Sequence, residues 1–127
     1  MGYESTIYLV EKHIDFKNDN GKSWAQVVAM YDLCSMGYHS EFNKLFASKD
    51  VIESRDSNCF IYIGNKEVSE DCYGSPLTEA TIDETIVALE TDFDPNDSYR
   101  RIPPLLGMLK AIDQSLWKNL VVLHYGH

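Results

Sequence analysis

The first half of the chain alternates apolar stretches with polar turns. Residues 3–10 are rich in β-branched and aromatic side chains, which favours a strand. Ser23 and Gln26 have the spacing of a helix capping box. The apolar residues of that segment recur at helical intervals: Trp24, Val27, Val28, Tyr31 and Cys34. We therefore predict a strand, a helix from Ser23 that ends near Gly37, and a short helix over residues 41–48.

The second half contains two strand signals followed by a helix. Residues 59–64 and 67–73 flank a short polar turn, which predicts a hairpin. Thr81 and Glu84 then form a second capping-box pattern, which marks the start of a helix. The apolar stripe of this helix consists of Ile82, Ile86, Leu89 and Phe93. This regular stripe predicts a helix with one face buried.

The end of the chain predicts one more helix and a buried strand. Pro103 and Pro104 suit the first turn of a helix. The apolar stripe of that helix is expected to be Leu105, Met108, Leu109, Ile112 and Leu116. Residues 120–123 form a continuous apolar run, which is typical of a strand buried on both faces. We expect this last strand to lie inside the sheet.

The predicted order of elements is β-α-α-β-β-α-α-β. This order indicates an α+β (mixed α/β) fold, in which helices pack on a mixed sheet of about four strands. The chain has 127 residues, of which 44% are hydrophobic and 24% are charged. These values are ordinary for one globular unit. We expect residues 1–127 to form a single domain without a membrane-spanning segment.

Charge is distributed unevenly along the chain. There are 20 acidic and 11 basic residues, and the formal net charge is -9. The segment from Glu67 to Tyr99, here called the acidic block, contains ten of the acids and no Lys, Arg or His. The block therefore carries -10 and the remainder of the chain carries +1. Nucleic acids and anionic membranes repel such a surface, so we expect neither as a direct partner, and a basic protein surface instead.

The acidic block is expected to follow one face of the helix after Thr81. Four carboxylates step by 4, 7 and 4 residues: Glu79, Asp83, Glu90 and Asp94. This spacing places them on one face if the helix extends that far. The candidate partner-binding residues are Glu79, Asp83, Glu84, Glu90, Asp92, Asp94 and Asp97. Like charges four residues apart weaken a helix, which favours a role in binding, although a solvated helix face has the same pattern.

Other short patterns are incomplete. Gly21-Lys22-Ser23 resembles part of a phosphate-binding loop, but Phe16 stands where the earlier glycine is required. Residues 92–97 begin like a calcium loop, but Asp97 and Pro103 occupy the positions of its Gly and Glu. The three cysteines have no Cys-x-x-Cys spacing, which is typical of reduced thiols in the cytoplasm. We expect no metal, no cofactor and no catalytic residue from these patterns.

The composition of this short, acidic, tyrosine-rich chain is similar to that of small mobile-element proteins that inhibit host nucleic-acid enzymes. The resemblance is one of composition and involves no particular residue. The one-sided charge distribution leads to the hypothesis of a non-enzymatic cytoplasmic module that binds a basic protein surface, with a nucleic-acid-binding protein as the natural target. One alternative is a small hydrolase or ligand-binding enzyme, which would combine a carboxylate with His124 or Arg100 and a divalent cation. Another is a structural oligomer; the sequence does not fix the oligomeric state.

Overall fold

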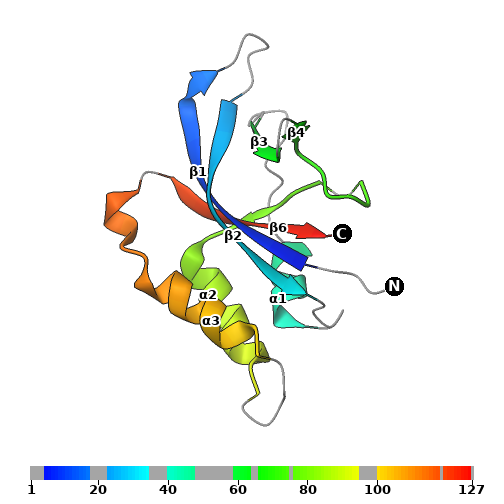
Figure 1. Cartoon of the computed structure of the whole chain (residues 1–127), viewed down its shortest axis with the longest axis vertical. Helices are drawn as coiled ribbons and strands as arrows, with labels where there is room; N and C mark the ends of the chain where they lie inside the picture. The colour runs from blue at the N-terminus through cyan, green and yellow to red at the C-terminus, as the bar shows by residue number, and fades with distance from the viewer. Residues whose placement is uncertain are drawn as a thin grey trace.

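The computed structural model describes most of the chain (Figure 1). The described residues are 5–17, 23–34, 40–47, 59–63, 66–74, 76–94, 100–117 and 119–126. The helix end predicted at Gly37 lies outside this set, as does Asn65 of the hairpin turn predicted at residues 65–66.

The described strands form one mixed sheet. They are β1 (Ser5–Lys17), β2 (Ser23–Cys34), β3 (Cys59–Ile63), β4 (Lys66–Val68), β5 (Glu79–Ala80) and β6 (Leu120–Gly126). Their order across the sheet is β4-β3-β2-β1-β6-β5. β2 and β3 run parallel, and the other neighbouring pairs run antiparallel. The α+β class with a mixed sheet is confirmed, and β2 and β5 are the strands that the sequence did not predict. The predicted hairpin is present as β3 and β4, but its second strand ends at Val68 and not at Tyr73.

The described helices correspond to three of the four predicted helices. They are α1 (Glu41–Ala47), α2 (Ile82–Asp92) and α3 (Ile102–Ala111), followed by the 3-10 turn η1 (Gln114–Leu116). The capping box of α2 is present, because Thr81 and Glu84 exchange hydrogen bonds between side chain and backbone, each of 3.1 Å. Pro103 and Pro104 lie in the first turn of α3. The assignment of Leu116 to the buried stripe of α3 is wrong, because this residue lies in η1 and is 77% exposed.

Residues 23–34 form strand β2, so the helix predicted from Ser23 is wrong. Side chains at odd positions from Ala25 to Leu33 are buried or half-buried. Side chains at the even positions are exposed: Gln26, Val28, Met30 and Asp32. Burial therefore has the period of two that characterises a strand. Val28 and Met30 are apolar although they are exposed, and this concealed the alternation.

A bulge in β2 changes the direction in which its side chains point. Leu9 of β1 pairs with Ala29, and Val10 pairs with Val27, so Val28 has no opposite residue on β1. Val27 packs on one side of the sheet, whereas Ala29 packs on the other. β2 therefore contributes to the apolar clusters on both faces of the sheet.

The two apolar clusters lie on opposite faces of the sheet. The cluster on the helical face contains Ile7, Leu9, Leu33, Phe42, Phe46, Ala80, Ile82, Leu89, Ile102, Leu105, Leu109 and Val122. The cluster on the other face contains Tyr8, Val10, Ala25, Ile61, Leu77 and Leu123. α2 and α3 lie side by side on the helical face (Figure 1). β6 lies between β1 and β5 and buries Val122 on one face and Leu123 on the other, as its apolar run predicted.

Candidate functional site

Glu79 lies in strand β5 and not on the acidic face of the helix. Its carboxylate oxygens are 2.9 and 3.1 Å from Nζ of Lys12 in β1. The side chains of Lys12 and Glu79 are 16% and 25% exposed, so water screens this ion pair only weakly. Because α2 begins at Ile82, the predicted placement of Glu79 and Asp83 on one helix is wrong. Glu79 instead ties β5 to β1 across the intervening strand β6.

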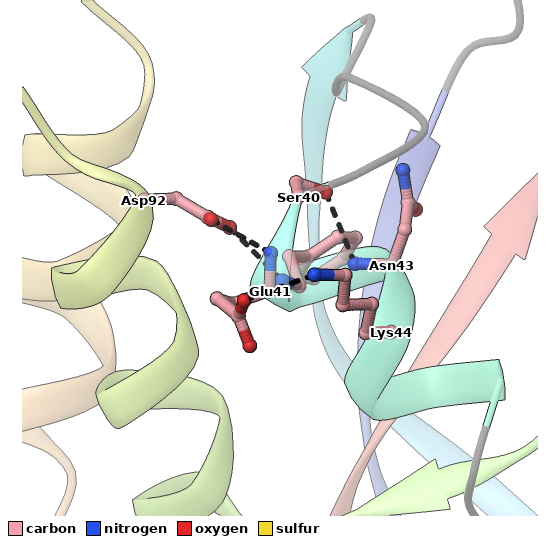
Figure 2. A network of polar contacts seen from close by, with 6 residues as sticks. Ser40, Glu41, Asn43, Lys44 and Asp92 are labelled. Atoms are coloured by element: carbon pink, nitrogen blue, oxygen red, sulfur yellow. Dashed lines mark hydrogen bonds and ion pairs between the residues drawn. The ribbon is translucent and has the colours of Figure 1, made fainter.

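Asp92, in the last turn of α2, closes the N-terminus of α1 (Figure 2). Its Oδ1 accepts the backbone N–H of Glu41 at 2.7 Å, and its Oδ2 accepts that of Phe42 at 2.9 Å. The first N–H groups of a helix have no partner within the helix, and this end attracts negative charge. Ser40 Oγ accepts a further N–H, that of Asn43, at 3.1 Å. Asp92 therefore joins α2 to α1.

Asp83 and Glu90 are exposed on α2. Asp83 Oδ1 accepts a hydrogen bond of 3.3 Å from Nε2 of Gln114, and Glu90 Oε1 lies 3.3 Å from Nζ of Lys110. Contacts of this kind at the surface contribute little to stability. Both carboxylates therefore remain accessible to a partner.

The remaining candidate residues have different surroundings. Glu84 is half-buried, and its carboxylate accepts the Thr81 N–H of the capping box. Asp94 is exposed beyond the C-cap of α2 at Phe93. Asp97 lies outside the described residues. The acidic face of α2 consequently consists of Asp83, Glu84 and Glu90, with Asp94 just past the end of the helix.

A groove of about 580 Å³ lies between α1 and α2. It is lined by Glu41, Lys44, Leu45, Asp83, Glu84, Val87, Ala88 and Thr91. Most of the lining surface is apolar. The apolar residues of the lining are Val87, which is 65% exposed, the half-buried Leu45 and the buried Ala88. The lining also includes three carboxylates and one ammonium group, so the groove is acidic overall. Figure 2 shows the Glu41 and Lys44 side chains, which form a 3.3 Å ion pair, on the α1 side of the groove.

Sequence reasoning did not identify this groove. Val87 falls outside the apolar stripe of α2 and lies between Asp83 and Glu90 in the sequence. This apolar residue on an otherwise acidic helix face is the one local feature of α2 that could have indicated the groove. The α1 side of the groove has no comparable local signal, because tertiary packing brings α1 against α2.

His124 of β6 is half-buried against α1. Its Nε2 lies 2.8 Å from Oγ of Ser5, and its ring packs on the rings of Phe42 and Phe46, with centroids 5.1 and 5.5 Å away. Ser5 is completely buried, so a substrate cannot reach its hydroxyl. The Ser5–His124 contact therefore serves packing rather than nucleophilic catalysis. Arg100, the other residue considered for an enzymatic site, is exposed near the start of α3.

Two tyrosines meet on the sheet face opposite the helices. The rings of Tyr8 and Tyr125 form an edge-to-face contact with centroids 6.1 Å apart. Burial raises the pKa of the Tyr8 phenol, and the neighbouring Tyr125 raises it further. Burial is also the main cause of the raised pKa of Tyr125. Both phenols are thus neutral at physiological pH and serve the packing of this face.

Within the described part of the chain, no three His, Cys, Asp or Glu side chains gather closely enough to hold a metal ion. Among the helices described, none is long and apolar enough to cross a membrane. In comparisons with known proteins, no family model, no curated protein and no solved structure matches the chain. The function must therefore be inferred from the chain's own residues.

Proposed function

We propose that this chain is a non-enzymatic interaction module that binds a basic protein surface through α2. The observation that carries the proposal is the solvent face of α2, where exposed Asp83 and Glu90 flank exposed Val87. Glu79 and Asp92 hold parts of the fold together, whereas Asp83 and Glu90 make only weak surface contacts. These two carboxylates are therefore available for an intermolecular contact.

The proposed partner is a nucleic-acid-binding protein of the cytoplasm, and binding would inhibit it by covering its basic groove. A Lys/Arg-lined groove attracts an array of carboxylates, and this attraction raises both the association rate and the specificity. The charge distribution supports this choice, because the acidic block carries -10 while the remainder of the chain carries +1. The free, exposed thiol of Cys72 is compatible with a reducing compartment.

Charge reversal on α2 tests this proposal. The tagged protein and its Asp83→Lys and Glu90→Lys variants would be used to capture partners from extracts of the source cells, at low and high salt. We expect a basic nucleic-acid-binding protein to be captured by the unmodified chain, and each variant to weaken that binding about tenfold at low salt. Glu70→Lys is the matched control, because it makes the same charge change at an exposed residue outside α2. Equal loss with all three variants would show that net charge, and not the α2 face, determines the binding.

A further inference from the structure

We infer that the groove between α1 and α2 receives one apolar side chain from the basic partner, with Val87 as the anchor of the interface. This inference rests on the proposed function and specifies where the partner docks. The occupant is a helical segment that presents one apolar side chain to the groove, with Lys or Arg one turn to either side.

The exposure of Val87 is the first observation. It is 65% exposed, although the structure places a buried stripe of apolar residues on the opposite side of α2. A valine is a weaker helix former than Ala, Leu or Glu, so helix stability does not account for it. The half-buried Leu45 of α1 and the buried Ala88 of α2 are the other apolar residues that line the groove. An apolar side chain placed in the groove would shield the exposed surface of Val87 from water.

The charges that line the groove determine the sign of the charge that a partner must carry. Glu41, Asp83 and Glu84 contribute three negative charges, and Lys44 contributes one positive charge. A segment with Lys or Arg three or four residues from its apolar anchor would place these cations on the same helix face, next to the carboxylates. Phosphate or carboxylate groups would be repelled from the same position.

The dimensions of the groove favour a protein segment. α1 has seven residues, which corresponds to a length of about 10 Å, or two turns of a docked helix. Small molecules bind in concave sites that bury most of their surface. This groove is instead wide open to solvent and is lined in part by charged side chains, so it suits a larger partner that covers it from outside.

Three synthetic helical peptides of about 15 residues test the inference. The first is Ala-based and has a central Leu with Lys three and four positions to either side. The second replaces the Leu with Ser, and the third keeps the Leu but replaces each Lys with Gln. Their binding to the full chain would be measured by fluorescence anisotropy at low and high salt. We expect the first peptide to bind about tenfold more tightly than either of the others at low salt.

Substitution of Val87 tests the anchor itself. In the Val87→Ser variant, the Leu and Ser peptides should bind within about twofold of each other, because the apolar contact is absent. Leu116→Ser is the matched control: this exposed apolar residue lies outside the groove, so the tenfold preference should persist. Circular dichroism checks that both variants are folded.

The possible results separate the two claims. Equal, salt-dependent binding of the Leu and Ser peptides to the unmodified chain would overturn the Val87 anchor and leave the proposed function intact. Equal binding of the first and third peptides, which differ only in Lys against Gln, would show that the groove recognises apolar side chains alone. It would overturn the claim that the partner segment is basic. If neither Lys-containing peptide binds at low salt, the proposed function fails, and the inference fails with it.

Discussion

Removal of the Asp92 carboxylate should loosen α1 from α2. The two hydrogen bonds to the N–H groups of Glu41 and Phe42, at 2.7 and 2.9 Å, would both be lost in Asp92→Ala. Loss of an N-cap costs about 0.5–2 kcal/mol, and loss of the attraction to the N-terminal helix dipole adds about 0.3–1 kcal/mol. The same carboxylate interacts unfavourably with the negative end of the α2 dipole, so its removal also stabilises the fold by a few tenths of a kcal/mol. We expect a net loss of about 2 kcal/mol in the free energy of unfolding.

Asp92→Asn provides a graded version of the same change. An amide side chain has one acceptor oxygen, so it keeps one of the two hydrogen bonds but carries no charge. We expect a loss of about 1 kcal/mol, half of that for Asp92→Ala. Urea unfolding followed by far-UV circular dichroism would measure both values.

Glu90→Gln is the matched control for Asp92. It neutralises another carboxylate of α2 whose surface contact with Lys110 contributes about 0.5 kcal/mol or less. The expected order of destabilisation is Asp92→Ala, then Asp92→Asn, then Glu90→Gln. An Asp92→Ala variant as stable as Glu90→Gln would refute the role of Asp92 as the cap of α1.

Three further substitutions probe other parts of the fold. Gly107→Ala should raise the free energy of unfolding by about 1 kcal/mol in the same urea assay, because Gly107 lies in α3 and an added Cβ would meet no atom within 4 Å. Lys12→Ala should cost about 1–2 kcal/mol, because it leaves the mostly buried Glu79 carboxylate unpaired; a double-mutant cycle with Glu79→Ala measures the coupling. Burial raises the pKa of the Tyr8 phenol above its ordinary value of 10.0, so ionisation of Tyr8 favours the unfolded state. The contribution of the neutral phenol to the free energy of unfolding is full below pH 10 and is lost as the pH rises through the folded-state pKa. Tyr8→Phe should therefore reduce the fall in Tm between about pH 9 and pH 11.

Each of these predictions has a result that contradicts it. A lower stability of Gly107→Ala would mean that the outer side of α3 is covered. Strict additivity of the Lys12 and Glu79 substitutions would mean that their ion pair contributes nothing. An alkaline decline in Tm that is identical with and without the Tyr8 hydroxyl would assign that decline to other groups.

Local sequence signals predicted α2 and β6 well. The Thr81 and Glu84 capping box located the start of α2 because both of its hydrogen bonds form within four residues of chain. The apolar run of β6 identified a strand buried on both faces because both of its side-chain rows pack against other elements. In such segments the local pattern and the tertiary environment favour the same structure.

Long-range contacts account for the features that the sequence did not predict. β2 is a strand because it pairs with β1 over most of its length, and the exposed apolar residues Val28 and Met30 concealed its period of two. The acidic residues posed a similar problem. Glu79 and Asp92 looked equivalent to Asp83 in sequence, but their partners lie 67 and about 50 residues away. The groove at Val87 likewise depends on the packing of α1 against α2.

Binding of a basic surface to α2 is tested most directly by NMR. The labelled chain would be titrated with the Leu-containing Lys peptide at low salt, and the backbone amide shifts would be followed. Localised shifts at Asp83, Val87 and Glu90 that disappear at high salt are the predicted result, because salt screens exposed charges. An absence of shifts on α2, or shifts confined to the strands, would contradict the assignment of α2 as the binding face.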